Sequence, residues 1–143
     1  MVTNIAALTR YSVKGAPGET LSEMTLIEGL GIEGDFHRGG DKQISILSAE
    51  VRRWMEAQPK PGLCFMRFRE NILLDGLDMR TLKPGGLLSV GTAVLKITKR
   101  GKRCFDECGL FTGGGSCRLA ECAVFAAVEK DGIIRVGDLV SML

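Results

Sequence analysis

The apolar residues of the chain fall in short, separated runs, a pattern typical of β-strands. Residues 23–28 alternate polar and apolar positions, as a half-buried strand does. Residues 43–47 place Ile44 and Ile46 on one face of another strand. Further strand-like stretches are predicted at 2–13, Phe65, 72–74, 87–90, 93–98, 124–128, 133–134 and 139–140. The stretch at 124–128 also fits a short helix.

One stretch has helical periodicity instead. Ser48 is a favourable N-cap, and Glu50 follows in the first turn, where the helix dipole favours an acidic side chain. Val51, Trp54 and Met55 continue at helical spacing. A Pro-Lys-Pro-Gly run comes next and cannot continue a helix, so one short helix is expected after Ser48.

Turns rich in glycine separate the predicted strands. The chain has 19 glycines and four prolines, and residues 29–42 form the largest predicted loop. Residues 87–90 and 93–98 are expected to form a hairpin through Gly91-Thr92. Many short strands with one or two short helices predict a closed β-barrel, because closure removes exposed strand edges. With 143 residues and no internal repeat or linker, residues 1–143 are expected to form a single domain.

Charge and composition argue against several classes of function. The net charge of +2 is too small to indicate binding to nucleic acid. The N-terminal apolar run, residues 5–8, is too short for a signal peptide or a membrane span. The five cysteines are an odd number in a chain without an export signal, so we expect reduced thiols in a cytoplasmic protein.

The segment KRGKRCFDEC, residues 99–108, carries the strongest signal for chemistry. Four cationic residues precede Cys104, and cations lower a cysteine's pKa by favouring the thiolate. The thiolate is the form that attacks sulfur, accepts a persulfide or binds a soft metal. The residues alone also fit a second interpretation, a solvated basic turn beside a buried thiol.

Two further features concern ligands. Residues 113–116 offer backbone N–H groups for an anion, although they lack the ending of a phosphate-binding loop and also fit a plain flexible loop. Arg118 would add a planar, bidentate donor. His37 is the only histidine, and its only acidic partner near in sequence is Asp35. The spacing of the last four cysteines is not characteristic of a structural zinc site, so we expect no zinc.

Several short motifs follow one another along the chain: SVKG at 12–15, GIEGDFH at 31–37, QISIL at 43–47, FRENI at 68–72, the turn region at 82–91, GKRC at 101–104 with Cys108, GSC at 115–117, VFA at 124–126 and GD at 137–138. In this order they resemble the MOSC family, the type of domain found at the C-terminus of molybdenum-cofactor sulfurases. The resemblance covers most of the chain. It implies a β-barrel that binds molybdenum-cofactor-related ligands or carries sulfur on its cysteine.

The resemblance also limits what this chain can do alone. Larger relatives carry a pyridoxal-phosphate desulfurase module, for which 143 residues leave no room. A separate sulfur donor, such as a PLP-dependent cysteine desulfurase, is therefore implied. Phe105 and Glu107 stand where small members commonly have histidine, which weakens metal ligation and proton transfer there but leaves thiolate chemistry intact.

The resemblance assigns roles to named residues. Cys104 is the predicted persulfide carrier or metal–sulfur ligand in a sulfurtransferase-like role, and Cys108 and Cys117 are nearby thiols that resolve or share the sulfur. Binding of the molybdenum cofactor, or a related pterin or molybdenum species, is predicted for Arg100, Lys102, Arg103, Arg118, His37 and Asn71. A molybdoenzyme or a cofactor-biosynthesis protein is an expected partner. The alternatives are a non-catalytic anion-binding or cofactor-binding module with structural thiols, and a docking partner of a molybdenum-pathway enzyme.

Overall fold

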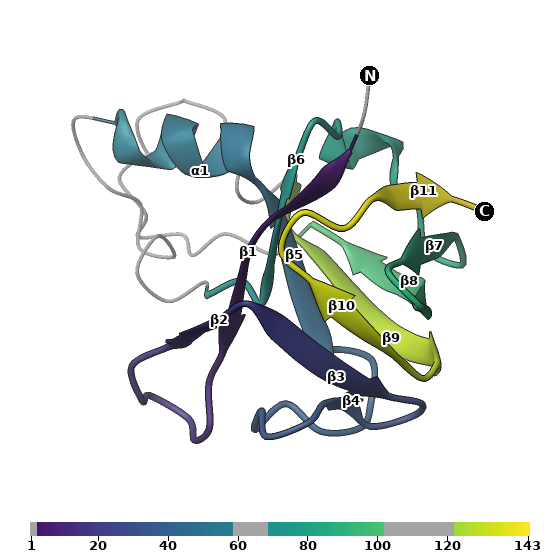
Figure 1. The fold of residues 1–143 in the computed structure, drawn as a ribbon. Coiled ribbons are helices and arrows are strands. Elements are labelled where there is room, and N and C mark those ends of the chain that lie inside the picture. The colour runs from purple at the N-terminus through teal and green to yellow at the C-terminus, as the bar shows by residue number, and fades with distance from the viewer. Residues whose placement is uncertain (1–2, 59–68, 102–121) are drawn as a thin grey trace.

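A computed structural model describes residues 3–58, 69–101 and 122–143 (Figure 1). Over these ranges the chain has eleven strands, the α-helix α1 (Ala49–Glu56) and the 3-10 turn η1 (Met79–Thr81). The prediction of a mostly β protein with one or two short helices is therefore confirmed.

The strands form two sheets. The larger has the order β11 (Val140–Met142), β7 (Leu87–Val90), β8 (Ala93–Arg100), β9 (Val124–Lys130), β5 (Ile44–Ser48), β6 (Ile72–Asp75), β1 (Asn4–Arg10) and β2 (Glu19–Leu21). The smaller has the order β10 (Gly132–Arg135), β3 (Glu23–Ile27) and β4 (Gly31–Ile32). Neighbouring strands are antiparallel except β5 and β6, which are parallel.

The larger sheet is an open half-barrel, which corrects the expected closed barrel. Its edges are β11 and β2, and the contact between its two ends is limited to an isolated bridge from Asn4 to Leu139 and the bonds beside it. Further along β1, Leu8 to Arg10 pair with β2 instead. Because β1 divides one edge between two partners and β11 has only three residues, no continuous ladder closes the ring.

Helix α1 makes the crossover between the parallel strands β5 and β6 (Figure 1). The Ser48 hydroxyl accepts a hydrogen bond from the Val51 N–H at 3.2 Å, as predicted for the N-cap. Val51 and Met55 are buried against the core. A parallel pair needs such a crossover, and the helix thereby covers part of the sheet.

Residues 124–128 lie in a strand, β9, and not in a helix. Val124, Ala126 and Val128 are buried, whereas Phe125 and Ala127 are only partly buried, which is the period of two that a strand imposes. Strand β5 is buried on both faces. On the face opposite Ile44 and Ile46, β5 carries Ser45, which belongs to the polar network described below.

The end of the chain divides between the two sheets. Strand β10 pairs with β3, whereas β11 pairs with β7, so residues 136–139 connect two sheets. The hairpin of β7 and β8 through Gly91-Thr92 is confirmed. Gly91 has a φ of 55°, and a Cβ there would lie 2.7 Å from the Ile133 carbonyl oxygen, so close packing requires glycine. In the part of the chain that the structure describes, no helix is long and apolar enough to cross a membrane.

Candidate functional site

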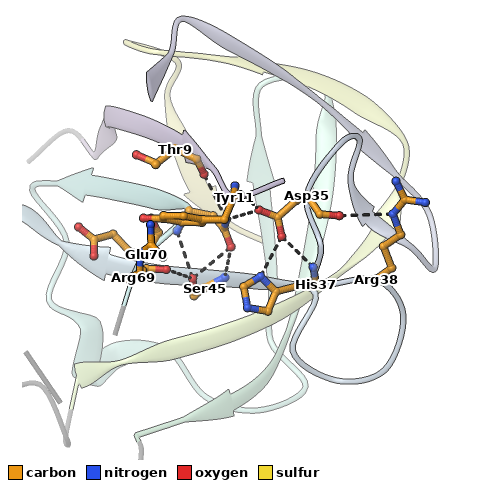
Figure 2. Close-up of polar contacts among 9 residues, drawn as sticks. Thr9, Tyr11, Asp35, His37, Arg38, Ser45, Arg69 and Glu70 are labelled. Carbon is orange, nitrogen blue, oxygen red and sulfur yellow. Dashed lines mark hydrogen bonds and ion pairs between the residues drawn. The ribbon is translucent and has the colours of Figure 1, made fainter. Parts of the chain in front are cut away.

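Asp35 lies at the centre of a polar network (Figure 2). One of its carboxylate oxygens, Oδ1, accepts hydrogen bonds from the Tyr11 N–H at 2.8 Å and the Asn71 side-chain amide at 3.1 Å. The other, Oδ2, accepts from the His37 N–H at 3.0 Å and contacts the His37 ring nitrogen Nδ1 at 2.8 Å. The carboxylate is buried, and these four partners replace the water that it loses.

The hydrogen bonds also determine the charge of Asp35. Burial raises the pKa of this carboxyl, but hydrogen bonds from the His37 side chain and from the Tyr11 and His37 N–H groups outweigh burial and hold the pKa below its usual value. Asp35 is therefore ionised at neutral pH. An ionised carboxylate only accepts hydrogen bonds, so Nδ1 of His37 carries the hydrogen that points at it.

This arrangement leaves Nε2 of His37 as the nitrogen available to a ligand. The side chain of His37 is 35% exposed, and its ring lies against Phe36, with the ring centroids 3.8 Å apart. Among the described residues Nε2 has no hydrogen-bond partner. In the neutral ring Nε2 accepts a hydrogen bond or a proton, and in the charged ring it donates one.

Asn71 connects the loop of Asp35 to two strands. Its amide nitrogen donates to the Thr9 carbonyl oxygen at 3.1 Å as well as to Asp35. Its amide oxygen accepts from the N–H and the hydroxyl of Ser45, at 3.0 and 3.1 Å. Asn71 is buried, and the hydrogen-bonding capacity of its amide is used within the protein. It holds the site together and does not present a polar atom to a ligand.

A second cluster supports the network from the side of α1. Arg52 of this helix forms a two-pronged ion pair with Glu70. The Tyr11 hydroxyl donates to the Glu70 carbonyl oxygen at 3.2 Å, and the Arg69 guanidinium lies 4.2 Å from the centre of the Tyr11 ring. Burial, followed by the nearby Glu70 carboxylate, raises the pKa of the Tyr11 hydroxyl, although Arg69 acts against them. Tyr11 is therefore neutral at physiological pH.

Arg38 follows the network in sequence but points away from it (Figure 2). Its Nε donates to the Asp35 carbonyl oxygen at 3.3 Å. Arg38 also lines a separate surface pocket of about 310 Å³ between β3 and the start of the loop at residues 29–42, called the glycine-rich loop below. This pocket therefore does not belong to the site around His37.

The structure separates the predicted site residues. His37 and Asn71 lie together, linked through Asp35, whereas Arg100 ends β8 and donates to the Arg80 carbonyl oxygen at 3.4 Å. The remaining predicted residues lie outside the described ranges: Lys102, Arg103, Cys104, Cys108, Cys117 and Arg118. The residues that flank this segment, Gly101 and Ala123, are described. The Gly101 N–H donates a hydrogen bond to the Ala123 carbonyl oxygen.

The cationic run before Cys104 is divided between the two faces of the sheet. Arg100 pairs in register with Val124, which is a core residue. Lys99 pairs with Phe125, on the opposite, partly exposed face. Residues paired across antiparallel strands project to the same face, so Lys99 and Arg100 project to opposite faces. Lys99 and Arg100 are therefore not side by side on one face of the sheet, where both could contact the same ligand.

Sequence reasoning did not assign a role to several residues that shape the site. Ser45 and Phe125 lie in the QISIL and VFA motifs but were given no role, Lys42 lies in no motif, and Asp35, in GIEGDFH, was considered only as a partner for His37. A buried Asn, Asp and Ser that satisfy one another can be found only when segments far apart in sequence are brought together. Within the described ranges, no cluster of three or more His, Cys, Asp or Glu residues is arranged to hold a metal ion.

The comparison with protein families decides the identity of this fold. The model of the MOSC domain matches residues 33–141, which is most of the chain and includes both His37 and the cysteine segment. The chain belongs to the MOSC domain family. The recognition made from the short motifs is thereby confirmed.

Solved structures show the same fold for this MOSC domain. The YuaD protein from Bacillus subtilis is similar, with a TM-score of 0.73 and 20% identity over 99% of this chain and 96% of that one. YiiM from Geobacillus stearothermophilus has a TM-score of 0.68 and 18% identity, covering 99% of this chain and 75% of that one. YiiM from Escherichia coli has a TM-score of 0.63 and 16% identity, covering 98% and 69%. No curated protein matches the chain.

Proposed function

We propose that this MOSC domain is an accessory protein of molybdenum-cofactor chemistry that carries sulfur on Cys104. The family match supports the general chemistry, since the family is linked to sulfur transfer associated with the molybdenum cofactor. The geometry that carries the proposal is the attachment of the cysteine segment. Its two ends are joined by the hydrogen bond from Gly101 to Ala123, at adjacent ends of β8 and β9.

Cys104, Cys108 and Cys117 all lie in the sequence between Gly101 and Ala123, the two residues that this hydrogen bond joins. The cations that precede Cys104 in sequence favour its thiolate, because opposite charge stabilises the ionised form. A thiolate at such a position is suited to nucleophilic attack on sulfur.

The transfer step needs no oxidant. The Cys104 thiolate attacks the outer sulfur of a persulfide on the donor, a new S–S bond forms, and the donor's own thiolate leaves. The charge and the number of electrons are conserved. The donor in this proposal is a separate PLP-dependent cysteine desulfurase, and the acceptor is a molybdoenzyme or a protein of cofactor biosynthesis.

The described donors fit part of a molybdenum-cofactor-type ligand. His37 offers Nε2 at the surface as a hydrogen-bonding group for such a ligand. Arg100 projects to the other face of the sheet, so it would not act on the same ligand as His37. A bound molybdenum centre would supply the metal that receives sulfur. His37 would orient the ligand by a hydrogen bond, with Asp35 holding the imidazole in place.

Intact-protein mass spectrometry tests the proposal. The full chain is incubated with a cysteine desulfurase and free cysteine, and a species heavier by roughly 32 Da, one sulfur atom, is expected on a thiolate. Cys104→Ser should abolish this species. Cys122→Ala is the matched control, because that thiol is buried just before β9, and it should leave the species unchanged. An unchanged mass for the parent protein, or a sulfur adduct that persists in Cys104→Ser, would overturn the assignment.

A further inference from the structure

A second functional surface adjoins the Asp35 network on the same face of the sheet. Ser45 on β5, Phe125 on β9 and Lys99 on β8 are consecutive cross-strand partners. Partners of this kind have Cβ atoms about 5 Å apart and share a face. The row therefore leads from the network, through Ser45, to a half-buried aromatic ring and a lysine.

A β-bulge brings Lys99 to this face. Ile97 pairs with Ala126 and Lys99 pairs with Phe125, so Thr98 is an extra residue in β8. Without the extra residue Lys99 would project into the core, because side chains alternate between faces along a strand. Bulges are common beside functional sites, where they re-aim a side chain. Here the bulge places the exposed residue Lys99 directly across from Phe125.

Lys42 reaches the same ring from the glycine-rich loop. Its ammonium nitrogen lies 5.0 Å from the centre of the Phe125 ring. The end of this loop is held to the sheet by a hydrogen bond from the Thr98 hydroxyl to the Asp41 carbonyl oxygen. The Gln43 side chain forms two further hydrogen bonds, each 3.0 Å long. Its amide nitrogen donates to the Gly40 carbonyl oxygen, and its amide oxygen accepts from the Val128 N–H. The backbone that carries Lys42 is therefore fixed relative to β8 and β9.

The two ammonium groups are not neutralised by ion pairs. Within the described part of the chain, neither Lys42 nor Lys99 has a carboxylate within salt-bridge distance. Asp41 adjoins Lys42 in sequence, and its carbonyl oxygen bonds to Thr98. Glu129 lies four residues beyond Phe125 on β9, or about 13 Å along a strand. Among the described residues, the balance of charge next to Phe125 is positive.

We infer that Lys42, whose ammonium group contacts the Phe125 ring, and Lys99, the cross-strand partner of Phe125, form a binding site for an oxyanion of the phosphate class. Two cations in one patch attract a dianion more strongly than either does alone, because their electrostatic potentials add. The inference deepens the proposed function, since it names one chemical group of the ligand. The inference rests on the proposed function only where it concerns the remainder of the ligand. The ligand is either a free dianion or a larger molecule in which a ring bears the phosphate.

Titration of the isotopically labelled full chain, followed by amide NMR, tests the site. The probes are inorganic phosphate and guanosine 5′-monophosphate, added at constant ionic strength with chloride as the counter-anion. We expect saturable shifts at Lys42, Lys99 and Phe125. Lys42→Met and Lys99→Met should each weaken phosphate binding about fivefold, the scale of one charge contact in water. The matched control is Lys130→Met, an exposed lysine at the far end of β9, which should bind as the parent protein does.

The outcomes separate this inference from the sulfur-carrier proposal. Phosphate binding that persists in Cys104→Ser supports the site, whatever that variant does in sulfur loading. Tighter binding of guanosine 5′-monophosphate than of phosphate assigns the oxyanion to a ring-bearing ligand, and equal binding assigns it to a free dianion. Shifts without saturation, or equal affinities in the parent, Lys42→Met and Lys99→Met proteins, would overturn the site. Lys42→Gln and Lys99→Gln provide a second pair if either Met variant loses its folded spectrum.

Discussion

The two polar regions on this face of the sheet differ in how their groups are satisfied. Around Asp35 each carboxylate oxygen has two partners, and the Asn71 amide is fully bonded. Around Phe125, Lys42 and Lys99 are exposed cations without a carboxylate partner in the described ranges. The polar groups of the first region hydrogen-bond within the protein and stabilise the fold, whereas the cations of the second region are available to a ligand. Substitutions in the first should therefore change stability, and those in the second should change affinity.

The largest effect is expected at Asp35. Asp35→Asn replaces one acceptor oxygen by an amide group that faces donors, and it removes the charge that holds His37. We expect the free energy of unfolding to fall by about 3 kcal/mol, as for other buried, hydrogen-bonded charges that lose their partners. Urea denaturation measures the change. The matched control, Asp41→Asn, alters an exposed residue and should shift the midpoint little. Equal stabilities for the two variants would contradict the central role of Asp35.

The difference in stability between the parent protein and Asp35→Asn should depend on pH. The pKa of Asp35 is lowered by folding, so its ionised form stabilises the folded state at pH values above the pKa in the unfolded chain, about 3.9. This contribution is lost as the pH falls through the lower, folded-state pKa. The stability difference between the parent and Asp35→Asn should accordingly be constant near neutrality and shrink below about pH 4. A difference that grows on acidification would reverse the assigned sign.

Asn71→Asp should have the next largest effect. The substitution keeps the shape of the side chain but turns the donor that faces Asp35 into an oxygen, 3.1 Å from another carboxylate oxygen. Like charges so close cannot both remain ionised, and we expect a loss of about 2 kcal/mol at pH 7 that diminishes in acid, where one carboxyl takes up a proton. Thermal unfolding at both pH values measures it. Full stability at pH 7 would mean that this contact does not exist.

A smaller effect is expected at the start of α1. Ser48→Ala removes the hydroxyl that accepts the Val51 N–H, and loss of such an N-cap costs about 1 kcal/mol. Denaturant unfolding measures the change, and Ser48→Asp, which retains an acceptor, should recover most of it. If the aspartate variant were no more stable than the alanine variant, burial of the side chain and not capping would govern this position.

The smallest effect on stability is expected in the second region. Lys42→Met removes a cation near Phe125 but leaves the apolar stem, and an exposed cation–π contact contributes about 0.5 kcal/mol. The melting temperature should therefore hardly change, although phosphate binding weakens. A loss of stability as large as that of Asp35→Asn would show that the two regions do not differ in kind.

Much of the fold could be predicted from sequence. The hairpin of β7 and β8, the N-cap at Ser48 and the extent of β3 and β5 agree with the structure, because each depends on local periodicity or on a turn. The two- and three-residue strands β4 and β2 were missed, since such short segments have no periodicity of their own. The division of residues 132–143 between two sheets also escaped prediction, because pairing partners are chosen over long distances.

The sequence by itself determined the family, the mostly β class and the position of the cysteine segment, since these depend on motifs and patterns that follow one another along the chain. Only the tertiary structure decided that the sheet stays open, because closure depends on whether β1 and β11 share a full ladder. It also decided that Asn71 is a bonded core residue and that Lys99 and Arg100 lie on opposite faces. Those outcomes arise from register and from a single bulge, and a shift of one residue in register exchanges the two faces of a strand.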